Sequence, residues 1–401
     1  MQGLILNGTK NVFEVECDDG ITRTCAIKGK VLKSSENYYN PLAPGDQVVL
    51  DSDSIEEDKA LICDLVPRKN EFVRWNVKKR QPQILATNLD YLLIVTTPDE
   101  PPFRPRFVDR ALAQAEYENL VPIIVCNKYD LVSGQGKGVN ADVGDFADET
   151  DAYADETGSF ASASDALGAT DAYAGETSSS FAQAVLSRRK RRFDSATDAS
   201  LAKEPLQSKN QRKSLTLAEQ FENQLQIWEN IGYRVIRSSA RTGEGIEELA
   251  HLIENKLSAF VGQSGVGKSS IINVLDNNVV LKTGSLSQKY GKGCHTTTKG
   301  SLIHLNLDEA LMGGRKVATA NIIDTPGVRR FLLHDISPEN LAFYFRDFKP
   351  FLGKCNFGMS CSHIHESGCA IKAAVQSGKI APERYETWLR IVEEMKTGDY
   401  D

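Results

Sequence analysis

The chain has 401 residues, of which 41% are hydrophobic and 25% are charged, and its net charge is −7. This length allows two or three domains, and the composition is that of an ordinary soluble protein. No apolar run approaches the ~18 residues of a membrane span, and the first residues lack the features of a secretory signal. Eight cysteines are too few for a disulfide scaffold. We therefore expect a cytoplasmic protein.

Acidic residues are concentrated in one stretch of the chain. Residues 141–176 carry ten Asp and Glu and no Lys or Arg. Without these ten charges the net charge of −7 becomes +3, so the rest of the chain is mildly basic. A basic remainder is compatible with a nucleic-acid partner but does not identify one.

Roughly the first 75 residues have the pattern of short strands separated by turns. The predicted strands are Gly3–Leu6, Asn11–Glu16, Ile21–Ile27, Gln47–Asp51 and Ala60–Leu65. Five short strands favour a small closed barrel such as an OB-fold, which we assign to residues 1–75 as an RNA-binding domain. A β-domain without any ligand would show the same pattern.

Basic and aromatic side chains alternate directly after these strands. The residues concerned are Arg68, Lys69, Phe72, Arg74, Trp75, Lys78, Lys79 and Arg80. Such a mixture can hold backbone phosphate and stack bases. It is equally typical of a solvated face, so it leaves both interpretations open.

From Leu89 the pattern changes to alternating strands and helices, which predicts a mostly parallel sheet with helices on both faces. Strands are predicted at Tyr91–Thr96, Pro122–Cys126, Tyr233–Arg237 and Ser258–Val261, and helices at Phe107–Leu120, Leu217–Gly232, Ile246–Leu257 and Ser269–Leu275. Ligands of such sheets lie beyond the carboxyl ends of the strands. Asn127, Ser238 and Gly262 all fall there.

A low-complexity stretch, about Val132–Ser214, interrupts this region. Asp151–Thr157 recurs in altered form as Asp171–Thr177, and the basic cluster Arg188–Arg192 follows. Two imperfect copies are too few for a stacked repeat, so we expect a disordered surface loop. The basic cluster would contact RNA or pair with the acidic half of its own loop, and the sequence favours neither.

A phosphate-binding loop follows the last predicted strand of this series. It fits G-x-x-x-x-G-K-[ST] and consists of Gly262, Gln263, Ser264, Gly265, Val266, Gly267, Lys268 and Ser269, with Ser270 next in the predicted helix. Backbone N–H groups of such a loop wrap phosphates, its lysine neutralises their charge, and its serine hydroxyl reaches Mg²⁺. The loop lies past the middle of the chain, after the base-reading residues, which reverses the usual order.

The base-reading residues follow two other strands. Asn127, Lys128 and Asp130 form an N-K-x-D motif, and a carboxylate at Asp130 would pair with the N1–H and N2 amine of guanine. Adenine offers neither group. Ser238, Ser239 and Ala240 follow the next strand and supply backbone donors for the guanine O6 atom.

A further apolar strand ends in Asp324-Thr-Pro-Gly327, where the aspartate can hold Mg²⁺ through water and the glycine N–H can meet a γ-phosphate. Between the two phosphate motifs, Thr297 is the preferred Mg²⁺ ligand of a mobile segment, with Thr296 second. Val328 stands where a Ras-type GTPase orients water with glutamine, which valine cannot do. His295 is the nearest polar substitute in the sequence, and an exposed or RNA-binding role is the alternative for it.

Three cysteines and a histidine form a compact set near the C-terminus. Cys355, Cys361, His363 and Cys369 provide a closed Cys₃His donor set that suits a structural Zn²⁺ ion. His365 competes with His363 for the fourth position, and free buried cysteines are the alternative. Helices are predicted on either side, at Ala370–Gln376 and Pro382–Met395.

Together these residues resemble the ribosome small-subunit-dependent GTPase A family (RsgA, also called YjeQ), over the whole chain except the insert. The resemblance implies a multidomain α/β protein. An OB-fold β-barrel occupies residues 1–75, a circularly permuted P-loop GTPase domain 76–335 with the insert 132–214, and a helical zinc-binding domain 336–401. It further implies a GTPase that is stimulated by the 30S subunit, binds 16S rRNA late in subunit assembly and leaves after hydrolysis. We expect a monomer that uses Mg²⁺ with GTP or GDP and one structural Zn²⁺.

The resemblance assigns the same roles to the motifs: the N-K-x-D residues read guanine, Gly262 to Ser270 hold the phosphates, and Asp324 to Gly327 form the γ-phosphate switch. With Lys268 and Gly327, the switch histidine His295 completes the catalytic set. The family also has a hydrophobic residue at the position of Val328. Cys294 departs from the family, which usually has arginine there.

Two other functions remain open from the sequence. One is an RNA-binding module whose nucleotide only stabilises the fold. The absence of a glutamine at Val328 slightly favours this function, and the intact Lys268, Ser269 and Asp324 disfavour it. The other is a metabolic P-loop kinase or ATPase, which the guanine-reading Asp130 disfavours.

Overall fold

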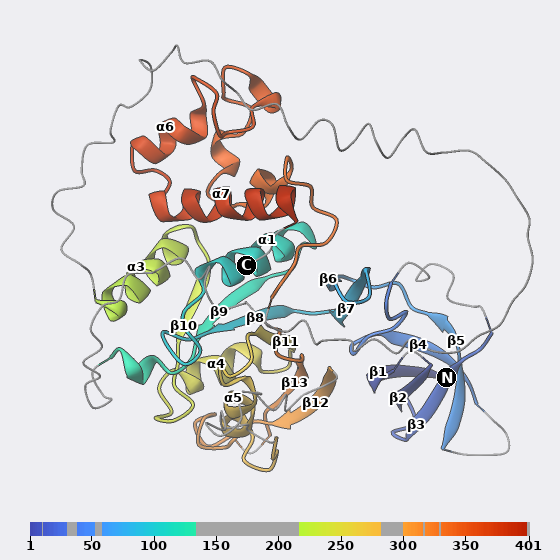
Figure 1. Cartoon of the computed structure of the whole chain (residues 1–401). Coiled ribbons are helices and arrows are strands. Elements are labelled where there is room, and N and C mark those ends of the chain that lie inside the picture. Colours follow the sequence, from blue (N-terminus) through green and yellow to red (C-terminus); the bar gives the residue numbers. More distant parts are fainter. Residues whose placement is uncertain are drawn as a thin grey trace, which may run out of the picture. The chain divides into compact units, whose positions relative to one another are not determined.

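The computed structural model describes residues 1–9, 11–29, 38–52, 58–133, 216–281, 300–315, 317–328 and 330–398 (Figure 1). Most of the predicted insert therefore lies outside the described residues, as do Cys294, His295, Thr296 and Thr297. No helix in the described part of the chain is long and apolar enough to cross a membrane.

The N-terminal region is a closed barrel of five strands. They are β1 (Gln2–Gly8), β2 (Val12–Cys17), β3 (Thr22–Ile27), β4 (Gln47–Ser52) and β5 (Lys59–Leu65). Neighbouring strands follow the order β1-β2-β3-β5-β4, and β4 pairs back onto β1 at Gln2↔Val49. Alternate side chains such as Phe13 and Val15 point into the interior, where they are almost fully buried, because side chains alternate along a strand. The predicted barrel is confirmed.

A hairpin follows the barrel, built from β6 (Glu71–Asn76) and β7 (Gln81–Thr87). The sequence pattern did not predict these strands. Phe72 is fully buried and stacks on Phe331 with ring centroids 5.2 Å apart. Arg68 is mostly buried and pairs with Asp46 at 2.7 Å. Part of the basic and aromatic run is therefore structural, and the expected domain boundary at residue 75 falls inside β6.

The α/β region has five parallel strands in the order β10-β9-β8-β11-β13. A sixth strand, β12, pairs antiparallel with β13, and β1 of the barrel pairs with β12 at Asn7↔Ser301. One sheet thus runs from the α/β region into the barrel within the described residues. The bounds are β8 (Tyr91–Thr96), β9 (Pro122–Cys126), β10 (Arg234–Arg237), β11 (Leu257–Gly262), β12 (Ser301–Asn306) and β13 (Thr319–Asp324).

Helices cover both faces of this sheet, as predicted (Figure 1). On one face Leu92 and Ile94 pack in the core that includes α1 and α3, and on the other Leu93 and Val95 pack in the core that includes α4 and α5. The alternation of neighbouring residues between faces follows from the strand geometry. The bounds are α1 (Pro105–Tyr117), α3 (Leu217–Asn230), α4 (Ile246–Ile253) and α5 (Lys268–Leu275), with a short 3₁₀ turn η2 (Tyr129–Leu131).

The C-terminal region consists of short turns and two helices. They are η4 (Leu341–Tyr344), η5 (Lys349–Phe351), η6 (Gly358–Ser360), α6 (Ala370–Gln376) and α7 (Pro382–Thr397). The fully buried Arg384 of α7 forms an ion pair with the fully buried Asp109 of α1, which also accepts a hydrogen bond from the Trp228 indole at 2.8 Å. Arg106 of α1 pairs with Glu394 of α7 at 2.6 Å. Buried charges thus join this region to the α/β region.

Candidate nucleotide site and metal centre

Strand register brings four predicted motifs to one edge of the parallel sheet. Cys126, the last residue of β9, lies opposite both Thr96 of β8 and Arg237 of β10. Gly262 of β11 lies opposite Val95 of β8, and Asp324 of β13 lies opposite Phe260 of β11. The loops that begin after these strands are therefore adjacent. They contain the N-K-x-D motif, the serine motif, the phosphate loop and the Asp324 motif.

The phosphate loop requires glycine at several positions, because its backbone has positive φ angles or lies very close to neighbouring atoms. Gly265 and Gly267 have φ angles of +87° and +89°, which favour glycine. A Cβ atom on Gly267 would lie 2.2 Å from Nδ2 of Asn127, and one on Gly262 would lie 2.6 Å from the Val95 carbonyl oxygen. The loop ends where α5 begins, so the unpaired N–H groups of the first helical turn meet the loop, as anion binding requires.

Asn127 joins the base-reading loop to the phosphate loop. Its Nδ2 donates to the Val266 carbonyl oxygen at 2.8 Å, and its Oδ1 accepts the Ala240 backbone N–H at 3.1 Å. The side chain is 1% exposed. Residues from three of the four motifs are thus held together by one amide, which fixes the distance between the predicted base and phosphate positions.

The carboxylate of Asp130 is buried and fully engaged. The Ser239 hydroxyl donates to its Oδ1 at 2.5 Å, and the Arg241 guanidinium forms an ion pair with its Oδ2. Ser239 also accepts the Thr242 backbone N–H at 3.2 Å. Arg241 is absent from the sequence-based set of site residues. The signal that was available is a cation directly after the Ser238–Ala240 motif.

Lys128 lies beside this carboxylate in the left-handed backbone region, with φ of 59°. Its ammonium donates to the Glu100 carbonyl oxygen. Burial lowers the pKa of Lys128, although nearby carboxylates oppose the shift. The Lys128 ammonium is therefore close enough to Asp130 to interact with its negative charge.

Lys268 is folded back onto its own loop. Its Nζ donates to the carbonyl oxygens of Gly262 and Gln263, both at 3.1 Å. Burial lowers the pKa of Lys268 to about 8, and the negative charge of Asp324 partly offsets this effect. A buried ammonium beside a buried carboxylate, 2% exposed at Asp324, suits a site that receives phosphate and a divalent cation.

The Asp324 motif packs directly on the phosphate loop. The Thr325 hydroxyl donates to the Phe260 carbonyl oxygen at 2.6 Å, and the Val328 N–H donates to the Gly262 carbonyl oxygen at 3.2 Å. A Cβ on Gly327 would lie 2.9 Å from Cα of Ser264. Val328 is 3% exposed and belongs to the hydrophobic core, so its side chain does not face the phosphate position.

The predicted Mg²⁺ ligands are only partly described. Ser269 lies half-buried in the first turn of α5, and Asp324 ends β13 on the neighbouring strand. Thr297 and the proposed catalytic His295 lie outside the described residues. The hard oxygen donors of Ser269 and Asp324 suit Mg²⁺.

The C-terminal Cys₃His set has the geometry of a tetrahedral metal centre. The ligand atoms of Cys355, Cys361, His363 and Cys369 lie within 4.8 Å of one another, and all four residues are buried. Nδ1 of His363 is 3.5 Å from Sγ of both Cys355 and Cys369, and these two sulfurs are 3.9 Å apart. Tetrahedral zinc predicts about 3.5 Å and about 3.8 Å for these separations.

Burial distinguishes the two candidate histidines of this centre, and neighbouring groups form hydrogen bonds to its ligand residues. His365 is exposed, so His363 is the imidazole of the set. The Ala370 N–H donates to Sγ of Cys355 at 3.3 Å, and the Tyr385 hydroxyl donates to the His363 carbonyl oxygen at 2.6 Å. Such contacts orient metal ligands.

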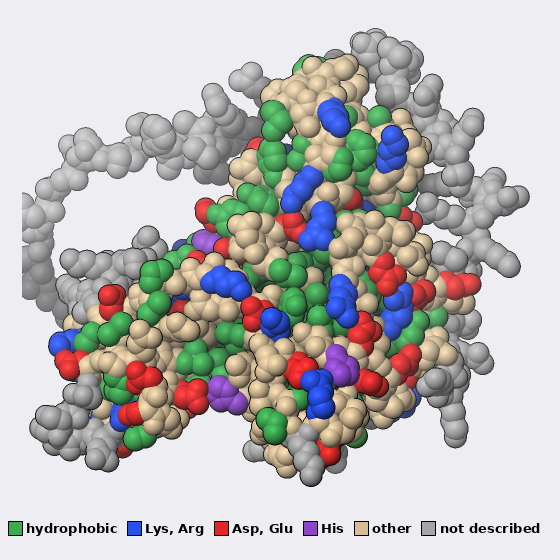
Figure 2. Space-filling view, turned by 180° about the vertical axis from the view of Figure 1, so that it is seen from behind, with side chains coloured by type: hydrophobic (Ala, Val, Ile, Leu, Met, Phe, Trp, Pro, Cys, Tyr) green, Lys and Arg blue, Asp and Glu red, His purple; other side chains and the backbone are tan. Residues whose placement is uncertain are grey.

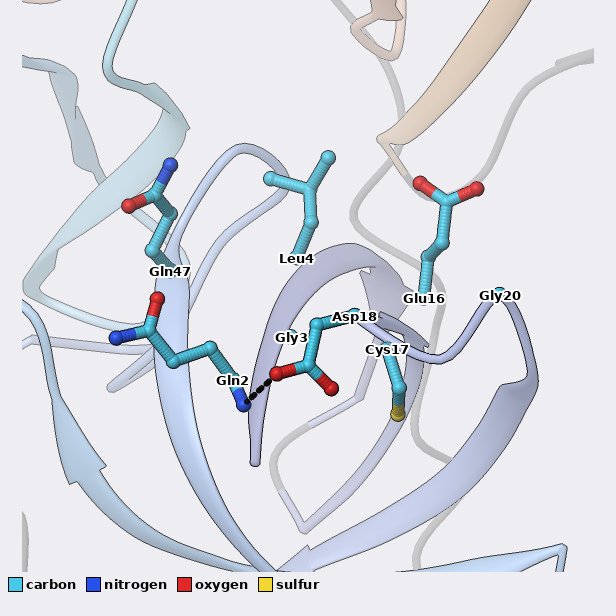
Figure 3. A pocket seen from close by; sticks show the side chains of 8 residues that line it. All are labelled: Gln2, Gly3, Leu4, Glu16, Cys17, Asp18, Gly20 and Gln47. Atoms are coloured by element: carbon cyan, nitrogen blue, oxygen red, sulfur yellow. Dashed lines mark hydrogen bonds between the residues drawn. The ribbon is translucent and has the colours of Figure 1, made fainter.

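A hollow of about 330 Å³ on the barrel is a different kind of feature (Figure 3). Its wall includes the side chains of Gln2, Glu16, Asp18 and Gln47, and Asp18 accepts the Gln2 backbone N–H at 3.1 Å. Carboxylates without a lysine or arginine in the lining do not suit a phosphate. This hollow is therefore not a candidate site for the phosphates of a nucleotide.

The fold and this edge define a P-loop nucleotide-binding protein in which the base-reading motif precedes the phosphate loop. The RsgA GTPase family model matches residues 65–153 and 204–334. The chain is 30% identical over 393 residues to the small ribosomal subunit biogenesis GTPase RsgA of Borrelia recurrentis (strain A1), covering 98% of this chain and 94% of the relative. It is 31% identical over 402 residues to the protein of that name from Chlorobaculum parvum, covering 98% of both.

Solved structures agree with the fold. The crystal structure of YjeQ from Thermotoga maritima superposes with a TM-score of 0.56 at 22% identity and covers 98% of each chain. YloQ, described as a circularly permuted GTPase, gives 0.54 at 20% identity and covers 100% of this chain and 96% of its own. The chain belongs to the RsgA GTPase family, and it is a GTPase, a hydrolase that acts on GTP.

Proposed function

We propose that this GTPase acts in the biogenesis of the small ribosomal subunit. In this proposal the 30S subunit stimulates hydrolysis of GTP to GDP and phosphate, the protein binds 16S rRNA late in assembly, and it leaves after hydrolysis. The observation that carries the proposal is similarity over 98% of the chain to relatives named for this role. The protein would act as a monomer in the cytoplasm.

The residue roles follow from the sheet edge. Asn127, Lys128 and Asp130, with Ser238 to Ala240, would hold guanine, and Gly262 to Ser270 would surround the phosphates. The 2.8 Å hydrogen bond from Asn127 to Val266 supports a single nucleotide spanning both loops. Ser269, Asp324 and Thr297 would hold Mg²⁺, which neutralises phosphate charge when bound.

Among the described residues, few groups at this edge of the sheet can take part in catalysis, which supports stimulation by a partner. Lys268 and the Gly327 N–H would stabilise charge on the transferred phosphate. Val328 is in the core, so it does not orient water. We propose His295 for that role. In this proposal, contact with the 30S subunit brings the segment that carries His295 to the phosphates.

Two surfaces support rRNA binding. Lys78, Lys79 and Arg80 are exposed at the turn between β6 and β7, Lys79 lies 5.9 Å from the Tyr39 ring centroid, and Trp75 is 38% exposed. Figure 2 shows a second surface, where several Lys and Arg side chains lie over the C-terminal elements. Cations beside an exposed aromatic ring suit phosphate contact and base stacking.

We also propose the division into three domains at residues 1–75, 76–335 and 336–401, with one structural Zn²⁺ in the last. The first boundary lies in the β6–β7 hairpin, which links the barrel to the α/β region. The closed donor set leaves no ligand position for substrate, because four protein ligands complete a tetrahedral zinc site.

The GTPase rate with and without purified 30S subunits tests the proposal. We expect strong stimulation by 30S subunits and none by 50S subunits, together with cosedimentation that is tighter with a non-hydrolysable GTP analogue than with GDP. An RNA-binding module whose nucleotide only stabilises the fold predicts cosedimentation without stimulation. That result would replace the proposed function.

A further inference from the structure

The guanine-reading carboxylate is covered by a side chain that the sequence analysis did not assign. The side chain of Asp130 is 3% exposed, whereas its ion-pair partner Arg241 is 65% exposed. Arg241 Nη2 contacts Oδ2 of Asp130, and Ser239 occupies Oδ1. A base therefore reaches this carboxylate only after the guanidinium moves away.

Guanine and the guanidinium group of Arg241 present similar hydrogen-bond donors to a carboxylate. Guanine presents its N1–H and its N2 amine side by side, and a guanidinium presents adjacent N–H donors in the same planar arrangement. Both suit a carboxylate that accepts in its own plane. Arg241 thus offers Asp130 the kind of donor that the base would offer.

Neighbouring contacts keep Asp130 in place while Arg241 remains free to move. Ser239 accepts the Thr242 N–H at 3.2 Å, so the Ser239 hydroxyl is oriented toward Asp130 from its own turn. Tyr129 N–H donates to the Ser238 carbonyl oxygen at 3.0 Å, which joins the two loops through their backbones. An ion pair with such an exposed arginine is weak, so its loss leaves the pocket intact.

We propose that the Arg241 guanidinium occupies the place of guanine on Asp130 when no nucleotide is bound, and that the base displaces it. Arg241 then competes with the base and lowers both the rate and the strength of guanine-nucleotide binding. This inference rests on the proposed reading of guanine by Asp130. In such an exchange the ion pair competes with the ligand, so removing it favours binding.

The test is the binding of fluorescent GDP to the full chain, measured at equilibrium and by stopped flow. Arg241→Ala should raise both the association rate and the affinity about two- to fivefold, the range expected from an exposed ion pair. Arg241→Lys, which keeps the charge but loses the planar donors, should fall between. Arg234→Ala is the matched control, because it removes an exposed arginine paired with Glu248 at 2.9 Å.

A double-variant cycle separates competition from other effects. In an Asp130→Asn background Arg241 has no carboxylate to pair with, and the expected ligand is xanthosine diphosphate. Arg241→Ala should then change the binding of this nucleotide no more than Arg234→Ala does. The proposal is overturned if Arg241→Ala equals Arg234→Ala in GDP binding, if it weakens GDP binding, or if its effect persists with Asn at 130. Failure of the unaltered chain to bind GDP would instead overturn the proposed function.

Discussion

The proposed zinc centre and the proposed nucleotide site draw their residues from the chain in opposite ways. The zinc ligands all lie between Cys355 and Cys369, and local turns bring their donor atoms within 4.8 Å. The nucleotide site takes its residues from the ends of separate strands between Cys126 and Asp324. We expect the first site to need a metal to hold its ligands together, whereas the second depends on the register of the parallel strands.

This difference predicts that damage to the two sites has different consequences. Loss of a zinc ligand should unfold the region that the metal organises, because a structural metal supplies folding free energy. Loss of a nucleotide-site residue should leave the sheet folded, because its core lies in the strands and helices rather than in the loops.

The largest expected effect comes from Cys355→Ser. Structural zinc contributes on the order of 10 kcal/mol in small zinc domains, so we expect loss of the metal and unfolding of the C-terminal region. Elemental analysis for zinc and circular dichroism on heating measure both outcomes. His365→Ala is the control, since His365 is exposed and should leave one zinc per chain. Retention of zinc and unchanged melting in Cys355→Ser would contradict the assignment.

The next largest effect concerns the buried ion pairs between the C-terminal region and the α/β region. Arg384→Ala removes the ion-pair partner of the buried Asp109 carboxylate. It also removes the partner of Asp347, whose carboxylate lies 3.4 Å from Arg384. Breaking a buried pair in this way costs about 3–5 kcal/mol. Urea unfolding should show this loss with zinc still bound.

Arg390→Ala provides the comparison on the same helix, because Arg390 is exposed. Equal stability of Arg384→Ala and Arg390→Ala would mean that the zinc region folds without help from α1. Two separate unfolding transitions in the unaltered chain would mean the same.

The smallest effect is a pH dependence at the end of α1. Burial, with the nearby negative charges of Glu71 and Asp335, raises the pKa of Glu118 from 4.5 to about 7, although Gln114 donates a hydrogen bond to it. A carboxyl group whose pKa is raised on folding stabilises the protein fully below its unfolded pKa, and this contribution is lost as pH rises through the folded value.

Glu118→Gln should therefore gain stability relative to the unaltered chain as pH rises from about 5 to 8. We expect a gain of about 1 kcal/mol, because the partly exposed carboxyl is screened by solvent. Melting temperatures over this pH range measure it, with the exposed Glu386→Gln as the control. A constant difference across the range would refute the assignment.

The sequence predicted the strands of the α/β region better than it predicted the hairpin that leads into them. The parallel strands end within a residue of the predicted positions, because their apolar runs stop at polar loops. The β6–β7 hairpin was missed because its strands mix charges with buried residues. A register shift between Phe72 and Val73 places both side chains inside, which breaks the expected alternation.

Contacts between distant side chains were also beyond prediction. Asn127 was predicted to read the base, which stays a prediction, and its hydrogen bonds to Val266 and Ala240 could not be predicted because they depend on strand order. The pairing of Arg241 with Asp130 depends on the same order. By contrast, the zinc ligands were predictable because all four lie in one short segment.

Nucleotide preference of an Asp130→Asn variant tests the central claim most directly. If the two distant loops hold one guanine nucleotide, the unaltered chain should prefer GDP to xanthosine diphosphate in competition binding, and the variant should reverse that order. An unchanged preference, or no uptake of either nucleotide by the unaltered chain, would contradict the account.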